Sequence, residues 1–182
     1  MENALARDAG PGDDALLPAL REMGLVGSET PRIVPLTGGV SSLIVRVEAE
    51  GRIFCAKGAL AKLKVAADWR APVRRNRAEA AWMREASLLV PGAVPAILGE
   101  APMHNVFAME WLSPEDHPVW KTRLLAGDIS PSFAGQVGTV IGRIHAGTAG
   151  RPELAARFAN ADDFDALRLD PYLRATAQRH PA

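Results

Sequence analysis

The chain has 182 residues, enough for one domain or for a small lobe joined to part of another. Its 21 basic and 21 acidic residues cancel, so the net charge gives no reason to expect a nucleic acid or membrane partner. A single cysteine, Cys55, excludes an internal disulfide, and no apolar stretch approaches about 18 residues. Without a signal-peptide pattern either, the sequence predicts a cytoplasmic protein.

The first 30 residues are expected to form an arm and one short helix. Residues 1–14 are rich in Ala, Gly, Asp and Pro, a composition typical of a loose terminus. A helix is predicted from Ala15 to Met23, and Gly24 is placed to end it.

A glycine pair followed by a hairpin is the most informative local pattern. Gly38 and Gly39 interrupt an extended stretch, and two strand-like segments then flank a turn signal at 50–52. These segments are Leu43–Val47 and Ile53–Ala56. The glycines either shape a turn or let the loop, with Ser41 and Ser42, approach an anion such as a phosphate.

A lone cation, Lys57, closes the second strand of the hairpin. A helix is predicted from Arg74 to Leu89, because good helix formers run up to Pro91. Its Glu79 is the favoured partner of Lys57 and Glu85 is the competitor, while a solvated carboxylate is the usual fate of a helix Glu. A glycine-rich turn, a strand-borne Lys and a helix-borne Glu, in this order, are typical of protein-kinase-like ATP sites.

Residues 105–112 predict a buried strand that ends where Ser113-Pro114 forces a turn. With this strand the chain resembles the aminoglycoside phosphotransferase-like kinases, which include choline, homoserine, methylthioribose and fructosamine kinases. Five segments carry the resemblance, in the order of that family and over most of the chain from about Pro31 onward. They are Gly38–Ser42, Phe54–Lys57, Arg77–Trp82, Phe107–Leu112 and Ile141–Ala146.

The resemblance implies an α+β, protein-kinase-like fold. Residues 31–112 are expected to form an ATP-binding small lobe, made of an antiparallel sheet, one main helix and a hinge strand. Residues 113–182 are expected to form the first helices of an incomplete helical large lobe. ATP, a magnesium ion and an unknown small hydroxylated substrate are the implied ligands, with the magnesium ligands expected beyond Ala182.

The resemblance also assigns roles to site residues. Adenine is expected to meet the carbonyl of Glu110, the N–H of Leu112 and the side chain of Met109, which is otherwise simply core filler. Strand alternation places Cys55 on the face of Lys57, where it either roofs adenine or is a buried structural thiol. The cofactor-binding set is therefore Gly38, Gly39, Ser41, Ser42, Cys55, Lys57, Glu79, Met109, Glu110 and Leu112.

The family's catalytic loop, His-Gly-Asp followed by Asn and then by a metal-binding Asp, does not occur in this sequence. Asp128 lies in a superficially similar segment, but Phe133 stands where Asn is required, so Ser130 is interpreted as a helix N-cap there. Asp163 and Asp165 are interpreted as helix-capping residues rather than metal ligands.

Two functions follow from this pattern. The first is the N-terminal part of an ATP-dependent phosphotransferase acting on a hydroxyl of a small molecule, inactive as this truncated chain. The alternative is a nucleotide-binding or partner-binding module of the same fold that has lost catalysis.

The remaining segments predict packing rather than chemistry. Apolar residues at helical spacing predict a core helix over Ser132–Gly147, whose glycines would admit a close neighbour and whose His145 is expected to be a hydrogen-bonded core histidine. If the large lobe is incomplete, this helix is left uncovered and self-association is expected. Lys62 and Lys64, and the cluster Arg70, Arg74, Arg75 and Arg77, are either phosphate contacts or solvated side chains.

Overall fold

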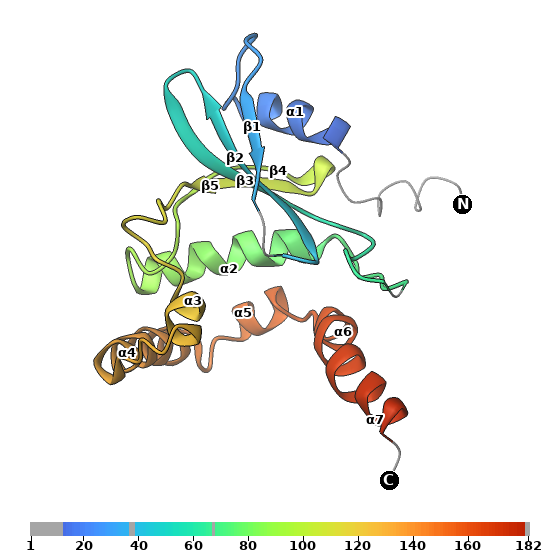
Figure 1. Cartoon of the computed structure of the whole chain (residues 1–182), viewed down its shortest axis with the longest axis vertical. Helices are drawn as coiled ribbons and strands as arrows, with labels where there is room; N and C mark the ends of the chain where they lie inside the picture. The colour runs from blue at the N-terminus through green and yellow to red at the C-terminus, as the bar shows by residue number, and fades with distance from the viewer. Residues whose placement is uncertain (1–12, 37–38, 67, 181–182) are drawn as a thin grey trace.

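The computed structural model describes residues 13–36, 39–66 and 68–180. It is a mixed α+β structure in three tiers (Figure 1): a sheet with one helix packed on it, a long helix beneath the sheet, and a lower group of helices. The middle helix contacts both the sheet above it and the helices below it.

Five antiparallel strands form the sheet, in the spatial order β1-β2-β3-β5-β4. Its strands are β1 (Arg32–Pro35), β2 (Ser42–Ala49), β3 (Arg52–Ala59), β4 (Ile97–Ala101) and β5 (Val106–Glu110). The predicted hairpin is confirmed, and its turn uses Glu50 and Gly51, both with positive φ (51° and 72°). Such two-residue turns match the twist of paired strands, and glycine adopts this backbone conformation without strain.

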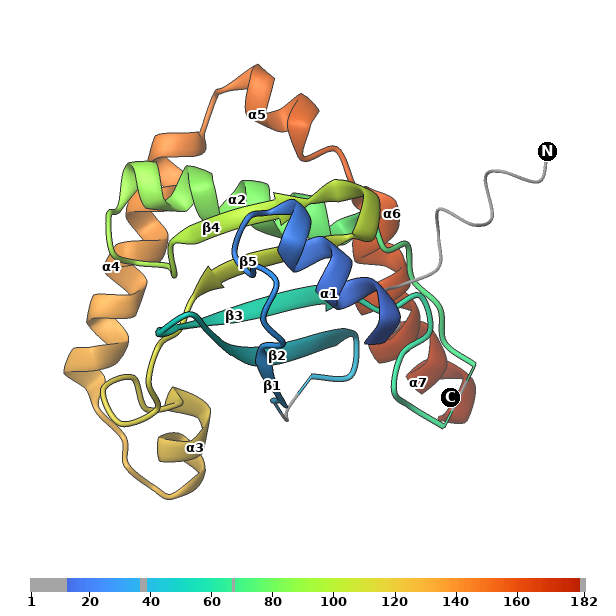
Figure 2. The same cartoon turned by 90° about the horizontal axis from the view of Figure 1, so that it is seen from above.

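Helix α1 (Asp13–Glu22) covers one face of the sheet (Figure 2). Its Leu16 and Leu20 pack into the main hydrophobic core with Val47 and Phe54 of the hairpin. Gly24 follows the helix with a φ of 67°, as expected for a residue that ends it.

Helix α2 (Arg75–Leu89) lies against the opposite face of the sheet and begins one residue later than predicted. Asn76, Ala80 and Ala86 are its buried residues, spaced along one side of the helix. Small alanines there let the helix axis come close to the strands.

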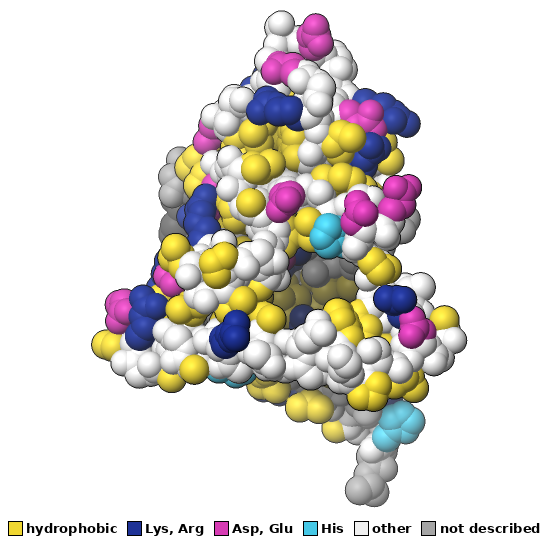
Figure 3. All heavy atoms as spheres, turned by 90° about the vertical axis from the view of Figure 1, so that its left-hand side faces the viewer, with side chains coloured by type: hydrophobic (Ala, Val, Ile, Leu, Met, Phe, Trp, Pro, Cys, Tyr) yellow, Lys and Arg dark blue, Asp and Glu magenta, His cyan; other side chains and the backbone are white. Residues whose placement is uncertain are grey.

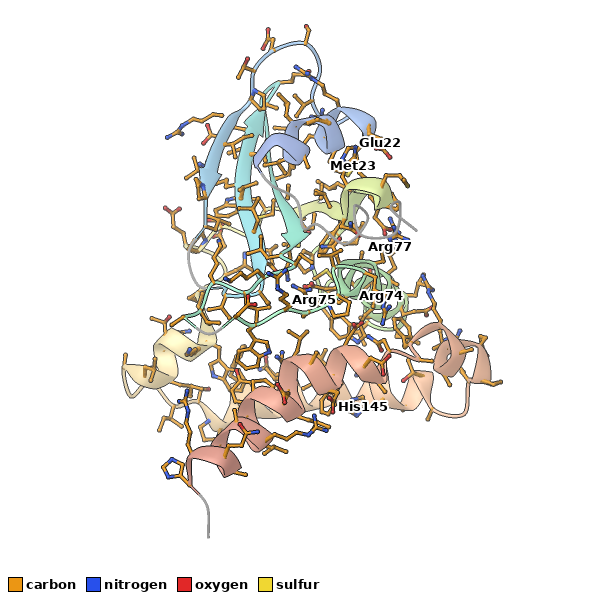
Figure 4. The ribbon with its side chains drawn as sticks, turned by 90° about the vertical axis from the view of Figure 1, so that its right-hand side faces the viewer. Glu22, Met23, Arg74, Arg75, Arg77 and His145 are labelled. Atoms are coloured by element: carbon orange, nitrogen blue, oxygen red, sulfur yellow. The ribbon has the colours of Figure 1, made fainter. Side chains whose placement is uncertain are left out.

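Arg75 ties the start of α2 to the sheet and its loops. Its guanidinium donates to four backbone carbonyls: Ser41 at 2.5 Å, Pro72 at 2.7 Å, Leu60 at 2.8 Å and Ala71 at 3.0 Å. Figure 4 shows Arg75 directed inward between the sheet and α2. The sequence analysis expected Arg75 to be a phosphate contact or a solvated side chain. Both alternatives are wrong for this residue, because its guanidinium binds backbone carbonyls. A guanidinium can satisfy several buried carbonyls at once because it carries five donors in one plane.

The lower tier consists of the helices that follow β5 in the chain. They are α3 (Trp120–Leu125), α4 (Pro131–Thr148), α5 (Pro152–Arg157), α6 (Ala161–Phe164), the π-helical segment η3 (Asp165–Arg174) and α7 (Ala175–Arg179), while a 3₁₀ turn, η2 (Pro102–His104), joins β4 to β5. Close packing of Gly147 on Leu89, and a hydrogen bond of 3.1 Å from Trp69 Nε1 to the Ala166 carbonyl, attach this tier to the rest. In the part of the chain that is described, no helix is long and apolar enough to cross a bilayer.

Helix α4 begins as predicted but is not a core helix. Ser130 caps it by accepting the Phe133 N–H at 3.2 Å, and Pro131 occupies its first position. Of the apolar stripe, only Ile144 is buried, and Phe133 and Ile141 are 43% and 47% exposed. The predicted close neighbour of its central glycines is absent among the described residues, since a Cβ at any of Gly135, Gly138 and Gly142 would meet no atom within 4 Å.

His145 is exposed, so its prediction as a core histidine is wrong. It follows the buried Ile144 directly in α4, in the lower tier of the molecule (Figure 4). Self-association through the uncovered apolar face of α4 stays a prediction.

We expect Arg75→Met to lower the free energy of unfolding by about 2 kcal/mol or more, because it leaves several carbonyls without donors. Arg74→Met is the matched control: the Arg74 side chain is 63% exposed, and its loss should change stability by less than about 0.5 kcal/mol. Urea unfolding followed by circular dichroism measures both. Equal losses in the two variants would show that the Arg75 hydrogen bonds contribute little.

Candidate functional site

An ion pair joins the sheet to α2 at the centre of the candidate site. Lys57 lies near the end of β3, and its Nζ donates to the Glu79 carboxylate. The two side chains are 16% and 34% exposed, so the pair lies at the edge of the core with one side open. The predicted choice of Glu79 as partner is confirmed.

Glu85, the competing carboxylate, has a different role. It lies two turns further along α2 and pairs with Arg157 at 3.4 Å and with Arg151 at 3.8 Å, both from the lower tier. Its carboxylate therefore links α2 to α5 rather than to the sheet.

Asn76 adds a second link between α2 and β3 at the same residue. Its side chain is buried, and Nδ2 donates to the backbone carbonyl of Lys57 at 3.2 Å. Lys57 is thus held by its backbone and by its ammonium, from residues one helical turn apart on one side of α2. The sequence analysis missed Asn76, although the i, i+3 spacing to Glu79 was a usable signal.

The strands beside Lys57 supply an apolar surface. Ile44 of β2 is the register partner of Lys57, and Met109 of β5 is the register partner of Cys55. Because partners in a ladder and residues two apart in a strand share a face, these four side chains lie on one side of the sheet. This side is the one that α2 covers only in part.

Cys55 is a buried thiol on this face, with 6% of its surface exposed. Burial raises the pKa of the Cys55 thiol above its ordinary value, and the positive charge of Arg46 offsets part of this rise. Its burial agrees with the structural interpretation of the thiol, while contact with adenine stays a prediction.

Arg46 and Trp111 lie at the end of the face where β5 leaves the sheet. The sequence analysis did not single them out. Arg46 is the register partner of Cys55 in β2, pairs with Glu48, and places its guanidinium 5.4 Å from the centre of the Trp111 ring. A cation over an indole at this distance is a favourable contact. The period of two along β2 was the signal that placed Arg46 beside Ile44.

The glycine loop leads directly to this face. Gly38 lies outside the described residues, whereas Gly39 is exposed and sits beside Ile44. A Cβ on Gly39 would meet Ile44 Cδ1 at an ordinary 3.9 Å and no other atom of the described residues within 4 Å. The fold itself therefore leaves room for a side chain at Gly39.

The end of the loop is held by the segment after β3. The carbonyl of Ser41 accepts the Leu60 N–H at 3.0 Å as well as Arg75, and the Val40 carbonyl accepts the Lys64 N–H at 2.7 Å. Ser42 begins β2 opposite Ala59. Ser41 and Ser42 are thus ordered by the sheet, and their backbone carbonyls are turned to structural partners.

Strand β5 ends at Glu110, whose N–H donates to the Ala96 carbonyl at 2.8 Å. Its carboxylate accepts the Ala96 N–H at 3.3 Å, which fixes the start of the connection to α3. The N–H of Leu112 makes no hydrogen bond to any other described residue. The molecule is hollowed on this side, between the sheet and the lower helices, and hydrophobic and basic side chains are visible inside the hollow (Figure 3).

The other basic candidates lie away from this face. Lys62 is 57% exposed and pairs with Asp68 at 3.3 Å, and the Lys64 side chain is exposed. Solvated side chains are therefore the better description of both.

The acidic candidates occupy other places. Asp128 pairs with Arg123 at 2.8 Å, and Asp165 pairs with Arg174 at 2.7 Å. The capping interpretation of Asp163 and Asp165 is wrong, since no side chain caps α6, and Asp163 is buried inside that helix. Among the residues with described positions, no group of three or more His, Cys, Asp or Glu is arranged to hold a metal ion.

Comparison with models of protein families gives no match, and comparison with curated proteins gives none either. The geometry of the chain is therefore the ground for a functional proposal.

We expect the Cys55 thiol to react slowly with iodoacetamide in the native protein, because only the thiolate reacts and burial disfavours it. The folded chain holds the thiol proton of Cys55 more tightly than the unfolded chain does. The protonated thiol therefore contributes fully to the free energy of unfolding below the ordinary cysteine pKa of about 8.5, and this contribution is lost as the pH rises above it. Alkylation rates between pH 6 and 10, in buffer and in urea, measure the effect. A native rate equal to the urea rate would contradict it.

Proposed function

We propose that the sheet face bearing Lys57 binds a nucleoside triphosphate, with ATP as the ligand. The single observation that carries the proposal is the Lys57–Glu79 pair, in which a strand-borne ammonium is held at an open edge of the core. A lysine fixed by a helix carboxylate is preorganised toward a phosphate, whereas a free surface lysine must first lose rotamer freedom.

The order of elements supports a protein-kinase-like small lobe. A glycine loop precedes the hairpin whose second strand carries Lys57, the glutamate helix follows, and β5 then leads out of the sheet toward helices. In protein kinases the lysine on the third strand and the glutamate of the following helix form this pair over the nucleotide. On this basis we propose the aminoglycoside phosphotransferase-like kinases as the nearest functional type.

Each part of the face then has a role toward ATP. Lys57 faces the α- and β-phosphates, and the loop with Gly38, Gly39, Ser41 and Ser42 lies over them with its N–H groups. Ile44, Cys55 and Met109 offer an apolar surface to the adenine ring, and the carbonyl of Glu110 and the N–H of Leu112 offer its hydrogen bonds.

The proposal for these residues is binding. Among the described residues, no group of three or more His, Cys, Asp or Glu is arranged to hold magnesium. Phosphoryl transfer to a small hydroxylated acceptor also requires a carboxylate base beside the acceptor, and the carboxylates placed on the described face, Glu79 and Glu48, are both paired with basic side chains. Transfer is therefore proposed only for a protein in which these groups are supplied to the same face.

Lys57→Ala is expected to weaken ATP binding about 10- to 100-fold, the effect of losing a charge-assisted contact worth about 1.5–3 kcal/mol. Lys62→Ala removes the same side chain from an exposed position and should change affinity less than about twofold. Titration calorimetry with ATP measures both, and urea unfolding checks that each variant is folded. Equal losses in the two variants would remove Lys57 from the proposed role.

Gly39→Ala separates loop function from fold stability. A Cβ fits at this position, so we expect the free energy of unfolding to change by less than about 0.5 kcal/mol. ATP binding should weaken, because the methyl group occupies space between the loop and the phosphates. Gly135→Ala in α4, where a Cβ also meets open space, is the matched control and should leave ATP binding unchanged. Unaltered ATP affinity in both variants would show that the loop does not approach the phosphates.

A further inference from the structure

A second cavity lies on the side of α2 that faces away from the Lys57 site. Its volume is about 430 Å³, it is open to solvent on one side, and α2, β4 and the segment joining α5 to α6 line it. The lining residues are Arg74, Arg77, Ala78, Ala81, Glu100, Arg157, Ala159, Asn160 and Asp163. The α2 residues among them follow the i, i+3, i+4, i+7 pattern of one helix face, opposite to the face that carries Asn76 and Glu79.

Three arginines line this cavity, and most of their N–H donors make no hydrogen bond to a described residue. Arg77 donates from Nη2 to the Pro102 carbonyl at 2.8 Å, Arg157 donates from Nη1 to Glu85 at 3.4 Å, and Arg74 lies 3.9 Å from Asp162. Each guanidinium has five N–H donors, so these contacts leave several free. Glu100, an acid on the cavity wall, is already paired with Arg84. The cavity therefore favours an anionic group such as a carboxylate or a phosphate.

Asp163 is an independent sign of a ligand. Only 4% of the surface of Asp163 is exposed, and its Oδ1 has no hydrogen-bond partner among the described residues. The other oxygen, Oδ2, accepts only a long hydrogen bond of 3.5 Å from Asn160 Nδ2. An unpartnered buried carboxylate oxygen is costly, and a donor supplied by a ligand would remove that cost.

We propose that this cavity binds a small zwitterion, with an anionic group on the arginines and an ammonium on Asp163. An ammonium is preferred to a hydroxyl because it brings three donors and neutralises the buried carboxylate. A volume of about 430 Å³ leaves room for an amino acid or an aminoalkyl phosphate. The two share the required chemistry and differ in whether the anion is a carboxylate or a phosphate. The site is separate from the Lys57 face, and its residues carry this proposal whether or not the Lys57 face binds a nucleotide.

Calorimetric titration of the full chain with four probes tests the proposal. O-phosphoethanolamine and 4-aminobutyrate carry both charges, whereas inorganic phosphate and ethanolamine carry one each. We expect at least one zwitterion to bind ten times or more as tightly as either single-charge probe, and the better zwitterion identifies the anionic group. Zwitterions that bind no better than inorganic phosphate, or no binding by any probe, would overturn the proposal.

Variants locate the binding within the cavity. Asp163→Asn should reduce the affinity for the better zwitterion about tenfold while leaving the affinity for phosphate at least as high. Asp162→Asn removes the same charge from the neighbouring, 91% exposed side chain and should change the zwitterion affinity less than twofold. Arg77→Gln should weaken both the zwitterion and phosphate, and it tests the site independently if Asp163→Asn does not fold. Equal effects of the two aspartate variants, or full zwitterion affinity in Arg77→Gln, would contradict the assignment.

Discussion

The attachment of α2 to β3 at Lys57 is the interaction on which the rest of this structure depends. A lysine at the edge of a core needs a counter-charge, and Glu79 supplies it, while Asn76 binds the carbonyl of the same residue. These two contacts set both the height of α2 against the sheet and its rotation about its own axis. Arg75, at the start of the helix, adds the carbonyls of the glycine loop and of the chain leaving β3. The loop, the lysine strand and the helix are therefore positioned by one short stretch of α2.

The upper and lower tiers are held by different kinds of force. Above α2, aliphatic and aromatic side chains from α1 and the sheet make a continuous core. Below α2, Glu85 pairs with two arginines, Trp69 donates to the Ala166 carbonyl and Gly147 packs on Leu89, while few apolar side chains, such as Ile144 and Leu154, are buried. Because this tier buries little apolar surface, it is expected to open well before the sheet does.

Sequence patterns predicted the elements whose causes are local. The hairpin turn and the helix termini at Gly24 and Ser130 follow from residues close in sequence, whereas the Lys57–Glu79 pair was predicted from the order of elements typical of protein-kinase-like ATP sites. The failures involve partners distant in sequence. Arg75 resembles any surface arginine until four carbonyls surround it, and the apolar stripe of α4 implies burial without saying what would cover it. The buried state of Asp163 depends on the approach of α2 to the segment after α5, which no spacing within the sequence encodes.

Helix α2 presents the ion pair on one face and the arginine cavity on the other, so it is a wall common to two sites. A small shift of the helix that closes one side must alter the other, because a helix moves as a rigid body. If both proposed sites bind their ligands, any free energy with which a ligand in the cavity beside Asp163 favours one position of α2 would add to, or subtract from, the free energy of nucleotide binding. By thermodynamic reciprocity the nucleotide would change the affinity of the ligand beside Asp163 by the same factor. Helix α2 would thereby couple the binding of two ligands that do not touch each other.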